Sequence, residues 1–240
     1  MSIELSEQEQ LRRQSLAALR ELGIDPYPAA RYEVTATARE IAENFDPAKN
    51  NFQGIRIAGR IMSRRIMGSA SFFELQDHTG RIQVYIRRDD ICPEGDPTLY
   101  NTVFKKLLDI GDIVGIEGFV FRTQMGEITV HAKNIKMLSK SLRPLPIVKM
   151  KDGKAYDAFE DPELRYRQRY VDLIVNDGVK DIFLQRATVL RTLRSVLDEA
   201  GYTEVETPTL QSIAGGASAR PFITHFNALD VDMYMRIATE

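Results

Sequence analysis

The feature that most constrains the fold is a stretch, beginning near residue 54, in which apolar and polar residues alternate. The alternation is clearest in three short segments, residues 55–59, 73–75 and 82–86. A period of two is typical of strands that bury one face. Residues 77–80 separate the second and third segments, and we expect a hairpin turn there in which Gly80 is free to take a positive φ. This stretch therefore predicts three consecutive strands.

The residues that follow extend these strands into a small barrel. Asp96 and Pro97 are typical of a helix start, and this helix is predicted to run to about Leu108. Two further strands are expected at 113–120 and 127–132. Five strands with a helix between the third and fourth is the order of an OB-fold barrel, whose second and third strands commonly bind single-stranded oligonucleotides. Alternation alone is also compatible with another small β-barrel.

Three side chains on the predicted outer face suit nucleic-acid binding. Phe73 must point inward with Leu75, because both belong to the apolar set, and Phe72 must then point outward. Arg65, Phe72 and Gln83 provide a cation for phosphate, an aromatic face for base stacking and an amide for hydrogen bonds to a base edge. Core packing is the alternative role for Phe72, and the alternation disfavours it.

The flanking segments predict helices, a linker and a second domain. Capping boxes begin helices after Ser6 and Thr37, and arginines on the first helix either contact RNA phosphates or form a solvated charged face. Residues 141–160 are interrupted by prolines and charges, which is typical of a linker. We expect an N-terminal helical extension (1–53), the barrel (54–140), this linker, and a further domain from 161 to 240.

The further domain is predicted to combine helices with a sheet. Asp161 and Pro162 begin a helix that is expected to run to Ile174, and an amphipathic helix follows over about 179–200. A strand is expected over 202–210, where Pro208 restricts it to an edge or ends it. Two more strands follow the glycine-rich turn. The fold class is therefore α+β.

Composition excludes several other classes of protein. The chain has 240 residues, a net charge of −2 and 43% hydrophobic residues, which indicates a globular protein whose nucleic-acid surface depends on local placement of cations. Cys92 is the single cysteine, so an internal disulfide and a cysteine zinc site are excluded. The three histidines show no metal-ligand spacing. We expect no membrane segment and no signal peptide, and hence a cytoplasmic location.

Several phrases, taken together and in order, resemble a class II lysyl-tRNA synthetase of the bacterial type. They lie at residues 59–72, 142–146, 165–173, 204–208, 215–225 and 232–238. The resemblance implies an OB-fold barrel that reads the tRNA anticodon and an antiparallel-sheet catalytic domain that forms a homodimer. It further implies that the parent enzyme activates lysine with ATP and transfers it to tRNA-Lys in the cytoplasm.

The resemblance also assigns residues. Arg65, Phe72, Gln83 and Glu127 match positions around the central anticodon uridine, with Phe72 stacking on the base and Gln83 and Arg65 bonding its edge. Pro208 ends the segment that matches the dimer motif. Lysine-binding positions match Gly216 and Glu240, which without the resemblance would be a plain turn and a frayed terminus. Glycine at 216 lets a substrate approach closely, and a carboxylate at 240 pairs with an ammonium.

The ATP- and Mg²⁺-binding motifs of the family lie beyond residue 240, so we assign no catalytic residue and no metal ligand in this chain. The 240 residues alone are expected not to form lysyl-adenylate, because Arg220 and Arg236 do not make a nucleotide site. Two alternatives remain. One is a stand-alone OB-fold RNA-binding or regulatory relative, and the other is an aspartyl- or asparaginyl-tRNA synthetase. The phrases at 165–173 and 215–217 favour lysine.

Overall fold

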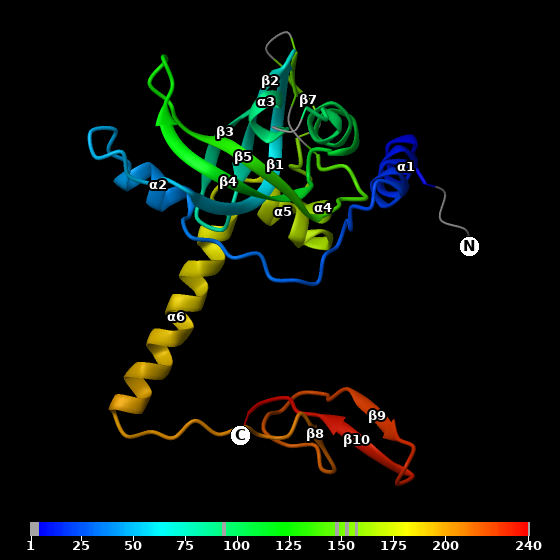
Figure 1. Ribbon diagram of the computed structural model, residues 1–240. Coiled ribbons are helices and arrows are strands. Elements are labelled where there is room, and N and C mark those ends of the chain that lie inside the picture. Colours follow the sequence, from blue (N-terminus) through cyan, green and yellow to red (C-terminus); the bar gives the residue numbers. More distant parts are fainter. Residues whose placement is uncertain (1–4, 93–94, 147–148, 152–153, 157, 240) are drawn as a thin grey trace. The chain divides into compact units, whose positions relative to one another are not determined.

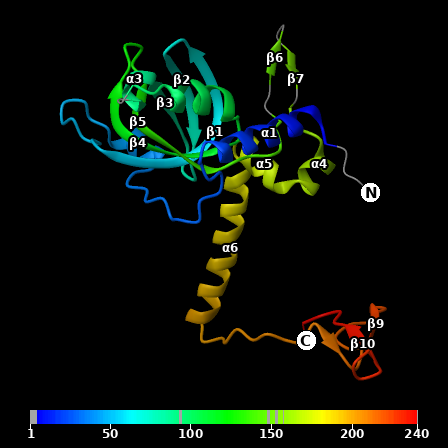
Figure 2. The same cartoon turned by 45° about the vertical axis from the view of Figure 1, so that its right-hand side comes forward.

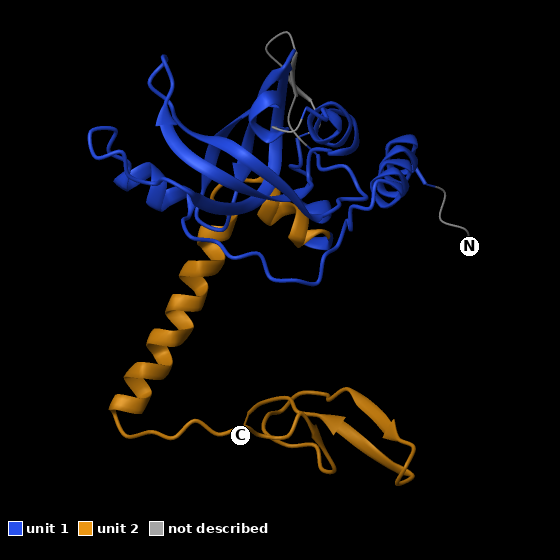
Figure 3. Ribbon diagram, viewed as in Figure 1, with its two compact units in different colours: residues 1–167 blue, residues 168–240 orange. Residues whose placement is uncertain are grey.

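A computed structural model describes residues 5–92, 95–146, 149–151, 154–156 and 158–239 (Figures 1 and 2). The chain divides into two compact units, Met1–Arg167 and Gln168–Glu240 (Figure 3). This division falls several residues after the expected domain start at 161. Within the described ranges, every helix is too short or too polar to cross a membrane.

The first unit is built on a closed five-stranded barrel. Its strands are β1 (Ile55–Met67), β2 (Ala70–Gln76), β3 (Arg81–Arg87), β4 (Ile113–Arg122) and β5 (Ile128–Ser139). They are arranged in the order β1-β2-β3-β5-β4, and only the β3–β5 pair is parallel. This topology confirms the predicted OB-fold.

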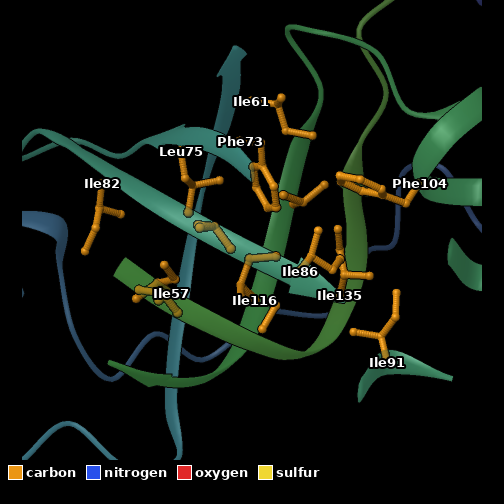
Figure 4. Close-up of a cluster of buried hydrophobic side chains, with 14 of the residues drawn as sticks. Ile57, Ile61, Phe73, Leu75, Ile82, Ile86, Ile91, Phe104, Ile116 and Ile135 are labelled. Carbon is orange, nitrogen blue, oxygen red and sulfur yellow. The ribbon is translucent and has the colours of Figure 1, made fainter. Parts of the chain in front are cut away.

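The barrel interior is formed by the predicted apolar positions. Ile57, Phe73, Leu75 and Ile86 are buried in one cluster with Phe104 (Figure 4). Phe73 is 2% exposed. The alternation of the sequence therefore predicted correctly which face of β2 and β3 points inward.

The β2–β3 turn is closed by a side chain. Asp77 Oδ1 accepts hydrogen bonds from the backbone N–H of Thr79 (2.6 Å) and of Gly80 (2.9 Å). Gly80 is not among the glycines with positive φ, so the prediction of a left-handed Gly80 is wrong. The carboxylate supplies the turn geometry that we expected from the glycine.

Two short helices lie between β3 and β4. The predicted helix is η1 (Leu99–Leu107), a π-helix in which bonds such as Leu108 N–H to the Val103 carbonyl span five residues (2.9 Å). Asp96 accepts a hydrogen bond from the Thr98 N–H (2.9 Å), as the helix-start signal indicated. Helix α3 (Arg88–Ile91) was not predicted, because four residues are too few to show periodicity.

Both predicted N-terminal helices are present. Helices α1 (Glu7–Glu21) and α2 (Ala38–Asn44) begin with the complete capping boxes expected at Ser6 and Thr37. One arginine of α1 has a structural role. Arg12 is almost buried and donates hydrogen bonds to the carbonyls of Ile110 (2.8 Å) and Ser141 (3.0 Å).

The segment expected to be a linker contains regular structure. Strands β6 (Lys149–Lys151) and β7 (Lys154–Tyr156) form an antiparallel pair, and α4 (Pro162–Arg167) ends the first unit. The single helix expected over 161–174 is two helices, because the backbone leaves the helical conformation at Gln168 (φ −119°, ψ 53°) before α5 (Arg169–Val175).

The second unit contains one long helix and a small antiparallel sheet. Helix α6 (Val179–Glu199) has nearly the predicted bounds. Strands β8 (Leu210–Gln211), β9 (Ile223–Phe226) and β10 (Val231–Met235) are ordered β8-β10-β9. The predicted strand over 202–210 is wrong, since residues 202–208 have no regular structure. Pro208 cannot donate to a ladder, and pairing begins only after it.

Candidate nucleic-acid interface

A pocket of about 540 Å³ lies on the outer surface of the barrel. Side chains from β1, β2, β3 and the loop between β4 and β5 line it. The lining includes Arg65, Phe72, Gln83 and Glu127, the four residues that the sequence assigned to one site. Residues separated by up to 62 positions in the sequence (65 to 127) therefore converge on one surface hollow, which we call the barrel pocket.

A β-bulge places Arg65 on this surface. The pairing of β1 with β2 shifts register between Ile61 and Ser63, and both Ile61 and Met62 are buried. Simple alternation from Ile55 onward would point every odd-numbered residue inward. The extra residue reverses the alternation, so Arg65 points outward opposite Phe72. The bulge is the element of the site that residue types alone did not reveal.

Phe72 presents a supported ring to the pocket. It is half-buried, while its neighbour Phe73 faces the core as predicted. The ring packs against Tyr85 on β3, with centroids 5.0 Å apart and planes inclined by 50°. A half-exposed ring held from one side is suited to stack on a planar base.

Gln83 and Glu127 form a hydrogen-bonded pair at the edge of the pocket. Gln83 Nε2 donates to Glu127 Oε2 (2.8 Å), and Gln83 Oε1 accepts from the Thr129 hydroxyl (2.9 Å). The β4–β5 turn holds Glu127, whose backbone N–H donates to Thr123 Oγ1 (3.0 Å). The amide orientation of Gln83 is therefore fixed by partners on β5 and the adjoining loop.

Two arginines of the pocket behave differently. Arg64 donates to the carbonyls of Phe104 (2.6 Å) and Leu108 (2.8 Å), and burial lowers its pKa. The Arg64 guanidinium therefore already forms hydrogen bonds within the first unit. Arg65 is exposed and has no hydrogen-bond or ion-pair partner among the described residues, which leaves it available to a ligand.

The lining residues that sequence reasoning did not assign to the site include Thr123 and Met125 of the β4–β5 loop. Met125 is 93% exposed at the tip of the β4–β5 loop. The signal that was available is the turn at Gly126, which has φ +89° and brings the loop back toward β3.

Of the two lysine-binding positions assigned by resemblance, the described structure contains only Gly216. Gly216 has φ +94°, and a Cβ there would lie 3.2 Å from the Cβ of Ala238, so backbone geometry already favours glycine. Glu240 lies outside the described residues. Both assignments stay predictions, as does the role of the segment ending at Pro208.

One of the two arginines considered above for a nucleotide site has partners within the second unit. No group of three His, Cys, Asp or Glu side chains in the described part of the chain could hold a metal ion. Arg236 donates to the carbonyl (2.8 Å) and hydroxyl (2.5 Å) of Thr207, so this arginine stabilises the fold of the second unit.

Comparison with known families agrees with this architecture. Residues 55–138 match a family model described as an OB-fold nucleic acid binding domain. Residues 161–240 match one described as tRNA synthetases class II (D, K and N).

Curated relatives extend the match over nearly the whole chain. A lysine–tRNA ligase of Porphyromonas gingivalis (strain W83) is 63% identical over 239 residues, which are 99% of this chain and 41% of the relative. The lysine–tRNA ligase of Azobacteroides pseudotrichonymphae is 59% identical and covers 98% of this chain and 47% of its own length. The lysine–tRNA ligase of Pelotomaculum thermopropionicum is 53% identical, and the match covers 99% of this chain and 44% of that relative. The chain thus spans less than half the length of these relatives.

The barrel, its pocket and these matches define a class II aminoacyl-tRNA synthetase sequence that carries an OB-fold nucleic-acid-binding domain. Within that class, the chain is similar over nearly its whole length to lysine–tRNA ligases, at 53–63% identity. The relatives described above therefore favour lysine over the aspartate and asparagine alternatives, which the family model covers equally.

Proposed function

We propose that the barrel reads the anticodon of tRNA-Lys, and that the protein as a whole is a lysine–tRNA ligase. The observation that carries this proposal is the convergence of Arg65, Phe72, Gln83 and Glu127 on one pocket of an OB-fold. An aromatic ring, an uncommitted cation and a fixed amide–carboxylate pair are the groups that hold a splayed single-stranded base.

The hydrogen-bond pattern of the pocket favours uracil over cytosine. Uracil presents two carbonyl oxygens and one N–H at its pairing edge. Arg65 and the second N–H of the Gln83 amide donate to carbonyl oxygens, and Glu127 accepts from the base N–H. Cytosine has an unprotonated ring nitrogen where uracil has the N–H, so the Glu127 carboxylate faces a lone pair instead. Phe72 stacks on either base.

The second unit contributes dimerisation and part of the lysine site in this proposal. Helix α6 carries one broad apolar stripe that suits an interface with a second copy of the chain, and Pro208 ends the segment that completes it. Gly216 and Glu240 bind lysine. ATP and Mg²⁺ are held by parts of the ligase other than the described residues, and the enzyme attaches lysine to tRNA through lysyl-adenylate in the cytoplasm.

The test is a titration of the chain with an anticodon stem-loop that has a central uridine, at one fixed salt concentration. Phe72→Ala removes the stacking partner and should weaken binding about 10-fold or more, since one stacked base contributes roughly 1–3 kcal/mol. Phe222→Ala is the matched control, because Phe222 is exposed on the second unit, and it should bind like the parent. Unchanged binding by Phe72→Ala would refute the assignment.

A further inference from the structure

Four rings form a row across the outer surface of the barrel. Phe72 on β2 is paired with Tyr85 on β3, Tyr85 with His131 on β5, and His131 with Phe119 on β4. The ring centroids of successive members are 5.0, 5.0 and 4.8 Å apart. A fifth ring, Phe121 on β4, packs beside the row at 5.8–6.4 Å from Tyr85, His131 and Phe119. Each ring is half-buried, so the row is a continuous aromatic contact that begins in the barrel pocket.

The centre of this row is fixed by a carboxylate. Asp90 on α3 has a side chain only 8% exposed, and it accepts a hydrogen bond from His131 Nε2 (2.8 Å). The same carboxylate accepts from Lys133 Nζ (2.8 Å) and Arg87 Nε (2.9 Å). Three donors from β3 and β5 thus converge on one nearly buried group, which holds the imidazole in one orientation.

Neither Asp90 nor His131 lines the pocket. We propose that both are positioning residues for base recognition. Asp90 orients His131, the edge-on contact of His131 with Tyr85 (86° between planes) orients Tyr85, and Tyr85 supports the Phe72 ring in its stacking position. This inference rests on the proposed function, because it needs Phe72 to stack on a base.

The physical reason is preorganisation. Tyr85 is the one ring that packs against Phe72 among the described residues, so without Tyr85 in place the Phe72 ring gains rotamer freedom that a bound base must then remove. A ring already fixed in the free protein loses less entropy on binding. Groups outside the pocket that fix the ring therefore raise affinity without contacting RNA.

The test compares two neighbouring aspartates. Asp90→Ala and Asp89→Ala each remove one negative charge, but the Asp89 side chain is 60% exposed and pairs with Arg88 alone among the described residues (2.9 Å). Charge alone predicts that both variants bind the uridine stem-loop slightly more tightly, because less negative charge repels the phosphates. Positioning predicts the opposite sign for Asp90→Ala, with binding weakened about threefold or more.

Each aspartate variant is also made in the Phe72→Ala background. There Asp90→Ala should behave like Asp89→Ala, because no ring remains to be positioned. An equal loss in both backgrounds would overturn the proposal, since Asp90 would then act on the fold or on RNA directly. His131→Leu is the second variant, because it leaves the contacts of Asp90 with Lys133 and Arg87 in place. It should show the same dependence on Phe72.

Thermal unfolding of every variant establishes that the barrel is folded at the temperature of the titration. These titrations distinguish a failure of the proposed function from a failure of the positioning proposal. If Phe72→Ala binds as the parent does, the proposed function fails. If Phe72→Ala weakens binding but neither Asp90→Ala nor His131→Leu does, only the positioning proposal fails.

Discussion

At the scale of single residues, the base specificity that we propose for the barrel pocket depends on the orientation of Gln83. An amide can present either a donor or an acceptor to a base, and in water the two exchange freely. Here the Thr129 hydroxyl donates a hydrogen bond to Gln83 Oε1, and Gln83 Nε2 donates one of its two N–H groups to the Glu127 carboxylate. The remaining N–H is therefore a donor of fixed direction. Gln83 can offer a base this donor but no acceptor.

Gln83→Leu should abolish most of the preference for a central uridine. Leucine keeps the approximate size of the side chain but removes the directed N–H and leaves Glu127 without this partner. We expect the difference in binding free energy between the cytidine and uridine stem-loops to shrink by about 1–3 kcal/mol, because the uridine loop binds more weakly. The cytidine loop should bind almost as before. Gln124→Leu, on the exposed β4–β5 loop, is the control and should retain the parental difference. A retained difference in Gln83→Leu would exclude the amide from base reading.

The residue types lining this pocket and the outward direction of Phe72 could be predicted, whereas the bulge and the row of rings could not. Alternation separated Phe72 from Phe73 because the two faces of a strand differ by one position. The outward direction of Arg65 depends on the bulge after Ile61, and a bulge leaves no regular trace in residue spacing. The row from Phe72 to Phe119 depends on the β3–β5 pairing, which only the closed barrel brings about.

Asp90 should make the barrel sensitive to acid. Burial by itself raises the pKa of Asp90, but hydrogen bonds from Lys133, His131 and Arg87 outweigh it and lower the pKa from 3.8 to about 2. A carboxyl group with a lower pKa in the folded state stabilises the fold above pH 4, and most of this contribution is lost as the pH falls from 4 to 2.

Urea unfolding of the parent and of Asp90→Asn at pH 6 and pH 2 measures this contribution. At pH 6 the parent should be more stable by on the order of 2 kcal/mol, and the difference should fall to about 0.4 kcal/mol at pH 2. Asp89→Asn, one position away and largely exposed, should match the parent at both values. A difference for Asp90→Asn that is the same at pH 6 and pH 2 would contradict the assignment.

At the scale of elements, a buried ion pair ties the end of β5 to β4 and to the N-terminal extension. Lys140 Nζ lies 2.8 Å from Asp112 Oδ2 and 2.5 Å from Asp109 Oδ2, and the side chains of Lys140 and Asp112 are fully buried. The backbone of Lys140 donates to the Pro26 carbonyl (3.1 Å) and accepts from the Tyr27 hydroxyl (3.0 Å). The same residue thus holds two segments distant in sequence.

Lys140→Met should destabilise the first unit by about 3–5 kcal/mol, the usual effect of removing one partner of a buried pair. Burial already raises the pKa of Asp112, and without the ammonium its carboxylate would be uncompensated. Lys136→Met, at an exposed position of β5, is the control and should change stability by less than about 0.5 kcal/mol. The measurement is chemical denaturation of the three proteins. Equal stability of the parent and Lys140→Met would show that the pair contributes nothing.

Elements with local signals were predictable, and those that depend on a distant partner were not. The capping boxes at Ser6 and Thr37 lie within one turn of the helices that they begin, so sequence sufficed. The extended segment over 202–208 has strand-forming residues, but pairing in a sheet requires a neighbouring strand. The described sheet of the second unit reaches this part of the chain only at Leu210.

At the scale of the whole molecule, α6 has an apolar surface that the described chain leaves exposed. Its stripe comprises Ile182, Phe183, Val189, Leu190, Leu193, Val196 and Leu197. At 100° per residue these positions occupy one continuous face of the helix. An exposed apolar face of this width suits the homodimer interface that we propose.

Leu193→Glu should shift the protein toward the monomer, because it places a charge in the middle of the stripe. Ser195→Glu introduces the same charge on the opposite face of α6 and should leave the oligomeric state of the parent unchanged. Analytical ultracentrifugation over a range of concentrations distinguishes the two. Equal sedimentation of both variants and the parent would place the interface elsewhere.

The proposed function depends most on the reading of one base by the barrel pocket. The decisive measurement is the ratio of dissociation constants for two anticodon stem-loops that differ only in a central uridine or cytidine, taken with the parent chain at one salt concentration. We expect clearly tighter binding of the uridine loop. Equal binding of the two loops would mean that the barrel attracts RNA through charge alone, and it would contradict the roles assigned to Arg65, Gln83 and Glu127.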